Sequence, residues 1–428
     1  MKDYPYWVDT LRPSDAEILQ NKLPERANLV VVGAGYTGLS AARTAARAGM
    51  SVLVVDRDSI GGGASSRNGG QVLTGLRPNP AALVNTYGAS EARRLFDAAS
   101  VAIHHLADLI ASESIECGFR KPGHIQAAWK PAHFESFREE QSLLRRVFAH
   151  EVHLVDRREQ RSELGSTCYH GLLVDEASAA VNPVQLVHGL ARAARRAGAC
   201  IVSHAAVERL ERTGHAWRVH TSRGVVQSAH LMIATNGYTG DATPALRRRL
   251  VPIGSFIIVT EPIDQSLADA VLPKRRMAFD SKHFLYYFRL LDDRRVLFGG
   301  RAQFTAPTAE STRRAAEILR RGMLTVFPDL EGVGIDYAWS GNVAFTRDQL
   351  PHGGEIDNMH FAAGYCGHGI ALATELGQLV ARRIIDGNSA ASRHPLLDRE
   401  LPAIPLYRGN PWFLPLAGAY YQVKDWLT

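Results

Sequence analysis

The chain has 428 residues, which is enough for a large core shared by two interleaved domains. Its net charge is +6, but the basic residues are scattered, and the short cluster at residues 247–249 does not predict a nucleic-acid-binding surface. No apolar run reaches the roughly 18 residues of a membrane span, and the N-terminus lacks the apolar segment of a signal peptide, so we expect a cytoplasmic protein. The four cysteines are far apart, which argues against a zinc site or a disulfide framework, and we expect no metal.

The N-terminal residues 1–26 carry aromatic side chains and prolines, and they predict an arm packed on the protein. Residues 29–56 then have the pattern of strand, tight turn, helix and strand. An apolar run is followed by Gly33, Gly35 and Gly38, by an alanine-rich segment at 39–48, and by a second apolar run that ends at Asp56.

In such a unit the first glycine permits the turn, the second lets the backbone approach a pyrophosphate, and the third lets the helix pack closely on the strand. The helix N-terminus attracts phosphate groups, and Asp56 can accept hydrogen bonds from ribose hydroxyls. The pattern predicts a dinucleotide site. The alternative is an ordinary turn between a strand and a helix.

Small residues dominate the next segment, residues 59–71, which reads S-I-G-G-G-A-S-S-R-N-G-G-Q. Such a composition lets the backbone run close to a flat or charged ligand, although a flexible linker is the alternative. This segment resembles the D-amino-acid-oxidase-like family of FAD-dependent oxidoreductases, and residues 64–71 look most like the gamma-glutamylputrescine oxidase branch. The resemblance implies that the segment passes beside the flavin.

The middle of the chain alternates helices and strands. Helical spacing predicts helices at 81–110 and 132–148, with a strand at 125–129 between them. Asn182 and Pro183 fit the start of a helix that ends at Gly198, and a strand follows at 199–202. The resemblance implies that Val207 meets the adenine end of FAD through its backbone.

A hairpin is expected at 217–226, and then a buried strand at 229–234 that ends in a polar turn, Thr235-Asn236-Gly237. This turn resembles the family segment that closes over the cofactor. The strands expected at 256–259, 284–289 and 295–298 suggest an antiparallel sheet that roofs the substrate site, and a helix is expected at 312–327. Tyr286, Phe288 and Arg301 are our substrate-site candidates there, although strand aromatics are equally often core residues.

A second glycine-rich turn, Gly364 to Gly369, follows a strand at 359–363 and opens a helix at 370–386. The positive end of a helix can stabilise negative charge on a ligand that it faces. The turn resembles the G-x-x-G-H-G turn that this family carries at the flavin, which implies that His368 lies near the isoalloxazine. A structural hydrogen bond at the helix start is the alternative role for His368.

The departures from the family are informative. Members that link flavin to cysteine have that residue in the segment matching 341–344, and members that link it to histidine have one near 66–68; this chain has neither. The resemblance therefore implies non-covalent FAD. Sarcosine-type members hold the substrate carboxylate with a lysine and an arginine at the positions that match Ala371 and Gln71. A short α-amino acid is thus a poorer candidate than an amine or a longer N-substituted amino acid.

The fold predicted by this resemblance is mixed α/β, with a Rossmann-like FAD-binding domain interleaved with an antiparallel-sheet substrate domain. We expect the arm and the first FAD-binding part at 1–80, substrate-domain parts at 81–150 and 246–335, further FAD-binding parts at 151–245 and 336–390, and a tail at 391–428. The residues predicted to bind the cofactor lie in the turns described above. They are Gly33, Gly35, Tyr36, Thr37, Gly38, Asp56, Arg57, Gly63, Ala64, Ser65, Ser66, Arg67, Asn68, Gly69, Gly70, Gln71, Val207, Thr235, Asn236, Gly237, Gly341, Gly364, Gly367, His368, Gly369, Ile370 and Ala371.

The expected reaction is hydride transfer from the carbon next to an amine nitrogen to flavin N5, followed by imine hydrolysis and by reoxidation with O2 to give H2O2. The catalytic candidates are His368, Tyr286 and Arg301, and gamma-glutamylputrescine is the suggested substrate. A dehydrogenase that passes electrons to a carrier is one alternative, for which the aromatic tail (Trp412, Phe413, Leu414, Tyr420, Tyr421, Trp426) is a candidate docking site. A non-catalytic flavin-binding subunit is another. The sequence leaves the oligomeric state open, a homo-oligomer included.

Overall fold

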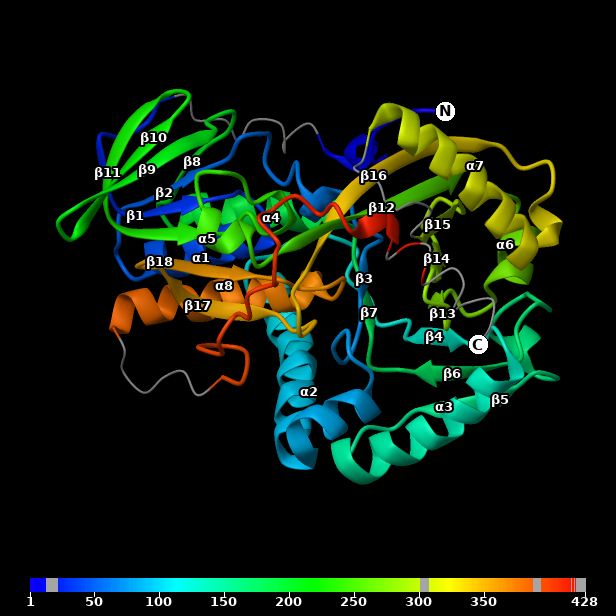
Figure 1. Ribbon diagram of the computed structural model, residues 1–428. Coiled ribbons are helices and arrows are strands. Elements are labelled where there is room, and N and C mark those ends of the chain that lie inside the picture. The colour runs from blue at the N-terminus through cyan, green and yellow to red at the C-terminus, as the bar shows by residue number, and fades with distance from the viewer. Residues whose placement is uncertain (13–21, 301–307, 388–393, 417, 419, 421–428) are drawn as a thin grey trace.

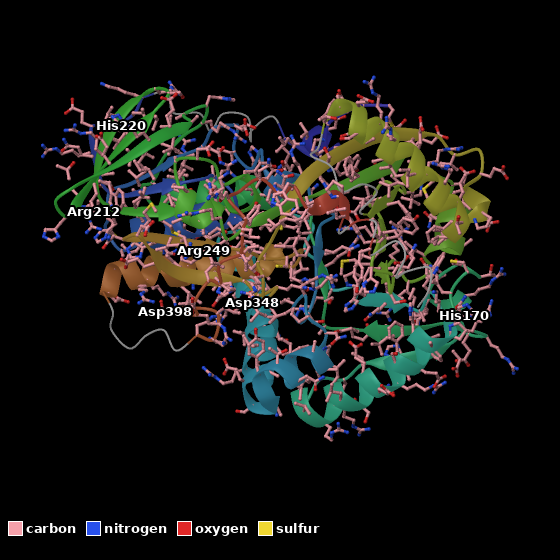
Figure 2. The ribbon with its side chains drawn as sticks, viewed as in Figure 1. His170, Arg212, His220, Arg249, Asp348 and Asp398 are labelled. Atoms are coloured by element: carbon pink, nitrogen blue, oxygen red, sulfur yellow. The ribbon has the colours of Figure 1, made fainter. Side chains whose placement is uncertain are left out.

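The computed structural model describes residues 1–12, 22–300, 308–387, 394–416, 418 and 420. The described strands form two eight-stranded sheets and one two-stranded sheet, and the two large sheets lie at opposite sides of the molecule in Figure 1. Figure 2 places Arg212 and His220 at the outer end of the first large sheet and His170 at the outer end of the second. Within the described residues, no helix combines the length and the apolar character that crossing a membrane requires.

The first sheet has a parallel centre. Its central strands run in the order β18, β11, β1, β2 and β8, and each pair along this order is parallel; β17 adds to β18 in the antiparallel sense, and β9 and β10 extend β11 as an antiparallel ribbon. The bounds are β1 (Arg26–Val32), β2 (Val52–Val55), β8 (Cys200–Val202), β9 (Val207–Thr213), β10 (Ala216–Thr221), β11 (Gly224–Ile233), β17 (His352–Ile356) and β18 (Met359–Ala363).

Successive side chains of β1 point to opposite faces of this sheet, and both faces are covered. Leu29 and Val31 belong to the large core shared with the helices, whereas Val30 belongs to the core beneath the β9–β10–β11 ribbon. The helices on the first face are α1 (Tyr36–Arg47), α4 (Pro183–Arg196) and α8 (Gly369–Asp386).

The second large sheet is antiparallel apart from the parallel pair β13–β4. Its order is β16 (Ile335–Phe345), β12 (Val251–Thr260), β15 (Val296–Gly300), β14 (Tyr286–Leu290), β13 (Met277–Asp280), β4 (His124–Ala127), β6 (Gly171–Asp175) and β5 (His153–Asp156). One face packs on α6 (Gln265–Val271) and α7 (Ala309–Val326). The small sheet pairs β3 (Gln71–Val72) with β7 (Ala179–Ala180).

The long helix α2 (Pro80–Ser112) contains a break at Gly88, where φ is +76°, and α3 (Pro131–Leu143) runs into a π-helical turn, η4 (Leu144–Phe148). The remaining short helices are η1 (Tyr6–Thr10), η3 (Ala64–Ser66), η5 (Gln160–Ser162), η6 (Asn236–Tyr238), α5 (Pro244–Arg247) and η7 (Pro328–Leu330). The cap predicted for α4 is confirmed, because the Asn182 side chain accepts from the Gln185 N–H at 3.2 Å.

The predicted fold class is confirmed, and so are the predicted hairpins, which are β10–β11 and β14–β15. The predicted helices at 81–110, 132–148, 312–327 and 370–386 correspond to α2, to α3 with η4, to α7 and to α8. Sheet membership differs from the expected domain ranges at three strands. Three strands from the ranges expected to bind FAD pair with strands of the substrate domain instead. They are β5 and β6 in the range 151–245 and β16 in the range 336–390, and the chain crosses between the two sheets inside those ranges.

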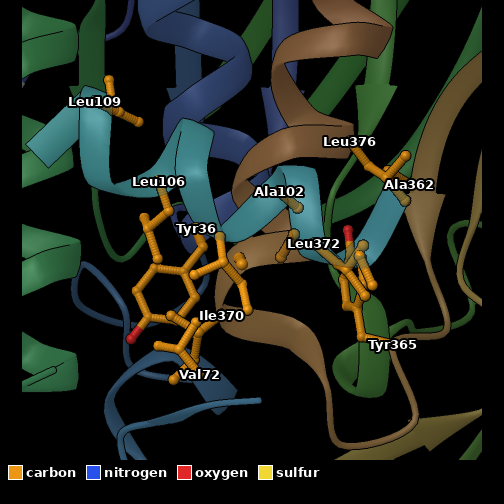
Figure 3. Close-up of a cluster of buried hydrophobic side chains, with 14 of the residues drawn as sticks. Tyr36, Val72, Ala102, Leu106, Leu109, Ala362, Tyr365, Ile370, Leu372 and Leu376 are labelled. Carbon is orange, nitrogen blue, oxygen red and sulfur yellow. The ribbon is translucent and has the colours of Figure 1, made fainter. Parts of the chain in front are cut away.

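The helices α1 and α8 cross closely, and this crossing matters for the site. A Cβ at Gly377 of α8 would lie 2.2 Å from the Thr37 carbonyl oxygen of α1, and the Ser40 hydroxyl donates to the Thr374 carbonyl at 2.7 Å. Figure 3 shows the surrounding core, in which Tyr36 lies near Ile370. The N-termini of α1 and α8 are thereby fixed relative to each other.

Candidate active site

A single cavity of about 530 Å³ connects the two large sheets. It begins at the carboxyl ends of β1, β2 and β11, where Val32, Val55 and Ile233 line it, and it extends past the second sheet to α3. Ligands of open α/β sheets bind beyond the carboxyl ends of the strands, so the cavity lies where the predicted dinucleotide would be held.

The first glycine turn has room for backbone only. Gly33 has φ +112°, and a Cβ there would lie 2.8 Å from the Ala234 carbonyl oxygen. A Cβ at Gly38 would lie 1.9 Å from the Gly33 carbonyl oxygen, so helix and turn pack without any side chain between them. Gly35 is the N-cap of α1 and has no capping side chain. The Tyr36 N–H donates to the Ser65 hydroxyl at 3.1 Å, and the N-terminal turn of the helix, Tyr36 and Thr37 included, lies at the cavity wall, where the positive end of the helix attracts phosphate. This cradle fits the pyrophosphate of FAD.

Asp56 lies at the end of β2 and lines the cavity. Its carboxylate accepts from the Ala34 N–H at 2.6 Å and from the Asp58 N–H at 2.9 Å, and burial raises its pKa. Each carboxylate oxygen keeps further acceptor capacity, which suits ribose hydroxyls. Arg57 and Val207 line the same end.

The glycine- and serine-rich loop after β2 is held by hydrogen bonds along its length. The Asn68 amide donates to the Ala64 carbonyl at 3.0 Å and to the Ser65 carbonyl at 3.1 Å, and it accepts from the Gly70 N–H at 2.9 Å. The Trp7 indole of the N-terminal arm donates to the Asn68 carbonyl at 2.9 Å. These bonds fix one loop conformation, unlike a flexible linker.

Distant elements hold the same loop from outside. The Trp339 indole donates to the Arg67 carbonyl at 2.9 Å, and the Arg67 side chain donates to the Ser340 carbonyl at 3.0 Å. The buried Arg289 of β14 donates to the Gly70 carbonyl at 2.8 Å and to the Val181 carbonyl at 3.1 Å. The protein's own side chains therefore hold this loop in one conformation.

The second glycine turn brings the N-terminus of α8 to the cavity. His368 is its N-cap, with no capping hydrogen bond from the side chain, and Gly367, His368, Gly369 and Ile370 line the wall. Burial, and secondarily the positive charge of Arg77, lower the pKa of His368 to about 4, so the imidazole is neutral at pH 7. Its Nδ1 is buried and has no hydrogen-bond partner among the described residues, as expected of an atom that faces a ligand.

The turns after β11 and β18 are joined directly, because the Asn236 side chain accepts from the Gly364 N–H at 2.9 Å. Tyr238 of η6 accepts from the Asn342 N–H at 3.1 Å, which ties β16 to the same place. Thr235, Asn236 and Gly341 line the cavity here. The four motifs that the sequence analysis singled out therefore surround one space.

Most of the predicted cofactor residues line this cavity. Six lie behind its wall, and they are Gly38, Ser66, Gly70, Gly237, Gly364 and Ala371. They shape the turns from behind: the Ser66 hydroxyl donates to the Gly61 carbonyl at 2.7 Å, and a Cβ at Gly364 would lie 2.3 Å from Thr346. Arg301 lies outside the described residues.

Two of the predicted substrate residues are not brought to the cavity. Tyr286 and Phe288 point to the α7 side of the second sheet, where they join its apolar core. Tyr287, between them, lines the cavity, and its hydroxyl lies 3.1 Å from the Ser255 hydroxyl. Neighbouring residues of a strand face opposite sides, so Tyr287 and Tyr286 cannot both face the ligand.

The sequence analysis missed the far end of the cavity, which residues from β4, β13, α3 and nearby loops form. It is lined by His124, Gln126, Phe279, Glu140, His150 and Asp175. The sequence pattern here could have indicated this wall, because His124 and Gln126 alternate with the buried Ile125 and Ala127. Polar residues on one face of a strand indicate that this face points away from the core.

Comparison with known proteins is consistent with this geometry. Residues 28–383 match the family model described as DAO, FAD dependent oxidoreductase. The chain is 32% identical over 403 residues to the gamma-glutamylputrescine oxidoreductase of Escherichia coli, covering 93% of this chain and 92% of the relative. It is 33% identical over 375 residues to a probable oxidoreductase, OrdL, of Haemophilus influenzae, covering 86% and 85%.

Solved structures resemble the fold as well. The glycine oxidase of Geobacillus kaustophilus superposes with a TM-score of 0.72 at 19% identity, covering 87% of this chain and 98% of that one. The L-amino acid deaminase of Proteus vulgaris superposes with a TM-score of 0.68 at 17% identity, covering 90% and 98%. At these identities the likeness concerns the fold.

Proposed function

The chain belongs to the DAO family of FAD-dependent oxidoreductases, and on that premise we propose that it oxidises an amine whose reacting end enters the cavity beside His368. It is an enzyme that acts on amine or amino-acid substrates. The further proposal is that the substrate is a long amine, with gamma-glutamylputrescine as the leading candidate. The observation that carries it is the continuation of the cavity beyond the turn at His368 to α3.

FAD would be held by the residues already described: its pyrophosphate by the α1 N-terminus, its ribose by Asp56, and its flavin between the glycine- and serine-rich loop and the α8 N-terminus. When bound, FAD accepts a hydride from the carbon next to the amine nitrogen and passes the electrons on. The positive end of α8 stabilises negative charge at the edge that it faces. His368 contributes hydrogen bonding rather than charge, because its imidazole is neutral.

The chain's own residues provide orientation and exclude water. Tyr287 is wedged against the second sheet, since a Cβ at Gly299 would lie 2.3 Å from its ring, and it is a rigid wall for a substrate. The amine would bind in its neutral form, so that no side chain has to remove a proton from it before hydride transfer. The imine then leaves and is hydrolysed.

Non-covalent binding of FAD is also proposed. Cys366 lies in the second glycine turn, but its thiol donates to the Gly364 carbonyl at 3.1 Å and burial raises its pKa to about 11, so a nucleophilic thiolate is disfavoured. Acid precipitation of the purified protein tests this. Flavin in the supernatant supports the proposal, and flavin retained in the pellet contradicts it.

The decisive experiment is anaerobic mixing of the protein with gamma-glutamylputrescine, putrescine, sarcosine and several D-amino acids while the flavin absorbance is followed. Bleaching by the long amines and not by sarcosine is expected. Bleaching by sarcosine alone would contradict the choice of substrate class.

A dehydrogenase is the second candidate, and exposed apolar residues near the C-terminus favour it. Trp412, Leu416 and Tyr420 are 61%, 69% and 63% exposed, which is unusual for such side chains and suits the docking of an electron carrier. Tyr421 and Trp426 of the same tail lie outside the described residues. Admitting air to the reduced enzyme separates the two: rapid H2O2 formation indicates an oxidase, and slow reoxidation indicates a dehydrogenase.

A further inference from the structure

The far end of the cavity contains a carboxyl group in an unusual position. The inward face of α3 carries Phe134 and Phe137, and Leu144, two turns after Phe137, continues this face at the start of η4; all three are buried. Glu140 lies three residues after Phe137 and four before Leu144, so helical periodicity puts it on this same apolar face. It is partly buried and lines the cavity, whereas its neighbour Glu139 is exposed to solvent.

Glu140 also differs from the other carboxylates of the cavity, which all have partners. Asp56 accepts from two backbone N–H groups, Asp58 pairs with Arg57, and Asp241 pairs with Arg247.

Asp175, the other acidic residue at the far end of the cavity, also has hydrogen-bond partners. It accepts from the Thr74 hydroxyl at 2.6 Å, from His150 at 2.7 Å and from the Ala177 N–H at 2.7 Å. The Glu140 side chain has no hydrogen bond or ion pair with any described residue, and burial raises its pKa to about 7.

A carboxyl group with no partner on an apolar helix face costs folding free energy, so its presence calls for a ligand that compensates it. Besides the polar residues already named, the far end has aliphatic and aromatic lining residues, namely Phe96, Leu144, Val152 and Leu173. Such walls suit a hydrocarbon chain, and the carboxylate suits a cation at the end of that chain.

We propose that Glu140 binds a second cationic group of the substrate, an ammonium separated by an aliphatic chain from the amine that is oxidised. This proposal rests on the proposed amine oxidation and specifies its substrate class. The reacting amine is bound neutral, whereas the distant ammonium keeps its charge and donates to the Glu140 carboxylate. Putrescine carries such a group four carbons from the reacting amine. Gamma-glutamylputrescine carries an α-ammonium too, at a greater distance and beyond the amide that follows its four-carbon chain.

Binding to the reduced enzyme tests the proposal without turnover. With its flavin reduced by dithionite, the FAD-loaded enzyme cannot oxidise an amine, and calorimetry gives dissociation constants directly. Two matched pairs of probes differ only in the second ammonium: putrescine against butylamine, and gamma-glutamylputrescine against the same compound without its α-amino group. In the pair whose chain length reaches Glu140, the wild-type enzyme is expected to prefer the member with the second ammonium by about tenfold to hundredfold, the range for one charge-assisted hydrogen bond.

The variant Glu140→Gln is expected to bring this ratio close to one, while Glu139→Gln, one residue away on the exposed face, keeps it. Glu140→Gln removes a desolvated carboxyl, so its thermal midpoint is expected to stay at or above that of the wild type. A ratio unchanged in Glu140→Gln, or no preference in the wild type, overturns this proposal alone. If the wild type neither binds nor oxidises any amine of the panel, the proposed function fails with it.

Discussion

Replacing Asn68 by alanine removes the centre of the hydrogen-bond network in the glycine- and serine-rich loop. The amide of Asn68 donates to the carbonyls of Ala64 and Ser65 and, at 3.4 Å, to the Tyr36 hydroxyl, and it accepts from the Gly70 N–H. Alanine makes none of them. The three backbone groups lie at the cavity wall or directly behind it, so their order bears on cofactor binding.

The expected size of the effect follows from the three shorter bonds, which all join Asn68 to the loop backbone. Each neutral hydrogen bond contributes about 1 kcal/mol net, so the loop loses about 3 kcal/mol. Trp7 and Trp339 still hold the carbonyls of residues 68 and 67, and the loop keeps part of its order. FAD binding must then supply the missing order, and its dissociation constant is expected to rise by about tenfold to hundredfold.

Fluorescence titration of the apoprotein with FAD measures this change. Asn28→Ala is the matched control, because the exposed Asn28 near the start of β1 accepts from the backbone and the hydroxyl of Ser51 at 2.8 and 2.7 Å and does not line the cavity. Both variants are expected to lower the thermal midpoint slightly, and Asn68→Ala alone to weaken FAD binding. An FAD affinity for Asn68→Ala equal to that of the control would refute the argument that these loop hydrogen bonds support cofactor binding.

Three further outcomes are expected. Gly377→Ala puts a methyl group 2.2 Å from the Thr37 carbonyl oxygen, which forces α8 away from α1. Both the thermal midpoint and the FAD affinity should therefore fall. An unchanged FAD affinity would contradict the link between the two helix N-termini. Arg276→Met leaves the buried Glu163 with one of its two cationic partners, and a loss of about 3 kcal/mol or more in unfolding free energy is expected by denaturant titration. Burial raises the pKa of Asp175, but hydrogen bonds and neighbouring histidines outweigh burial and lower this pKa to about 2. The ionised carboxylate therefore adds about 2 kcal/mol to the free energy of unfolding at pH values above its unfolded pKa of 3.8, and this contribution is lost as the pH falls through 2. The acid unfolding of Asp175→Asn should lack that pH dependence.

The cofactor half of the cavity was predictable because its residues come in short local motifs. Each glycine turn follows its own strand and opens its own helix, so the spacing of Gly33 to Gly38, or of Gly364 to Gly369, carries the geometry within one segment. Parallel strands then bring the turns to one edge of the sheet. Sequence alone could not distinguish residues that line the cavity, such as Asn68, from residues that support the turn from behind, such as Gly70.

The substrate half was harder because the face of a strand decides the role of each residue. Tyr286 and Tyr287 are chemically equal and adjacent, and only their pairing with β15 decides which one faces the cavity: Tyr287 lies opposite Gly299, which leaves room for its ring. A shift of one residue would exchange the two. The aromatic composition of the strand therefore predicted a substrate wall without predicting which side chains form it.

The two halves of the cavity are thus under different constraints. The cofactor half consists of turns in which a single Cβ at Gly33 or Gly38 would clash with backbone, so its sequence has little freedom while the ligand stays the same. The far end is assembled from side chains of α3, β4, β6, β13 and loops rather than from tight glycine turns, and the variant Glu140→Gln is expected to keep the fold. A relative can therefore share the cofactor half of the cavity and differ in the far end. For this reason, 32% identity to a gamma-glutamylputrescine oxidoreductase is better evidence for the type of reaction than for the substrate. The charge at position 140 is the more direct indicator of which amines enter.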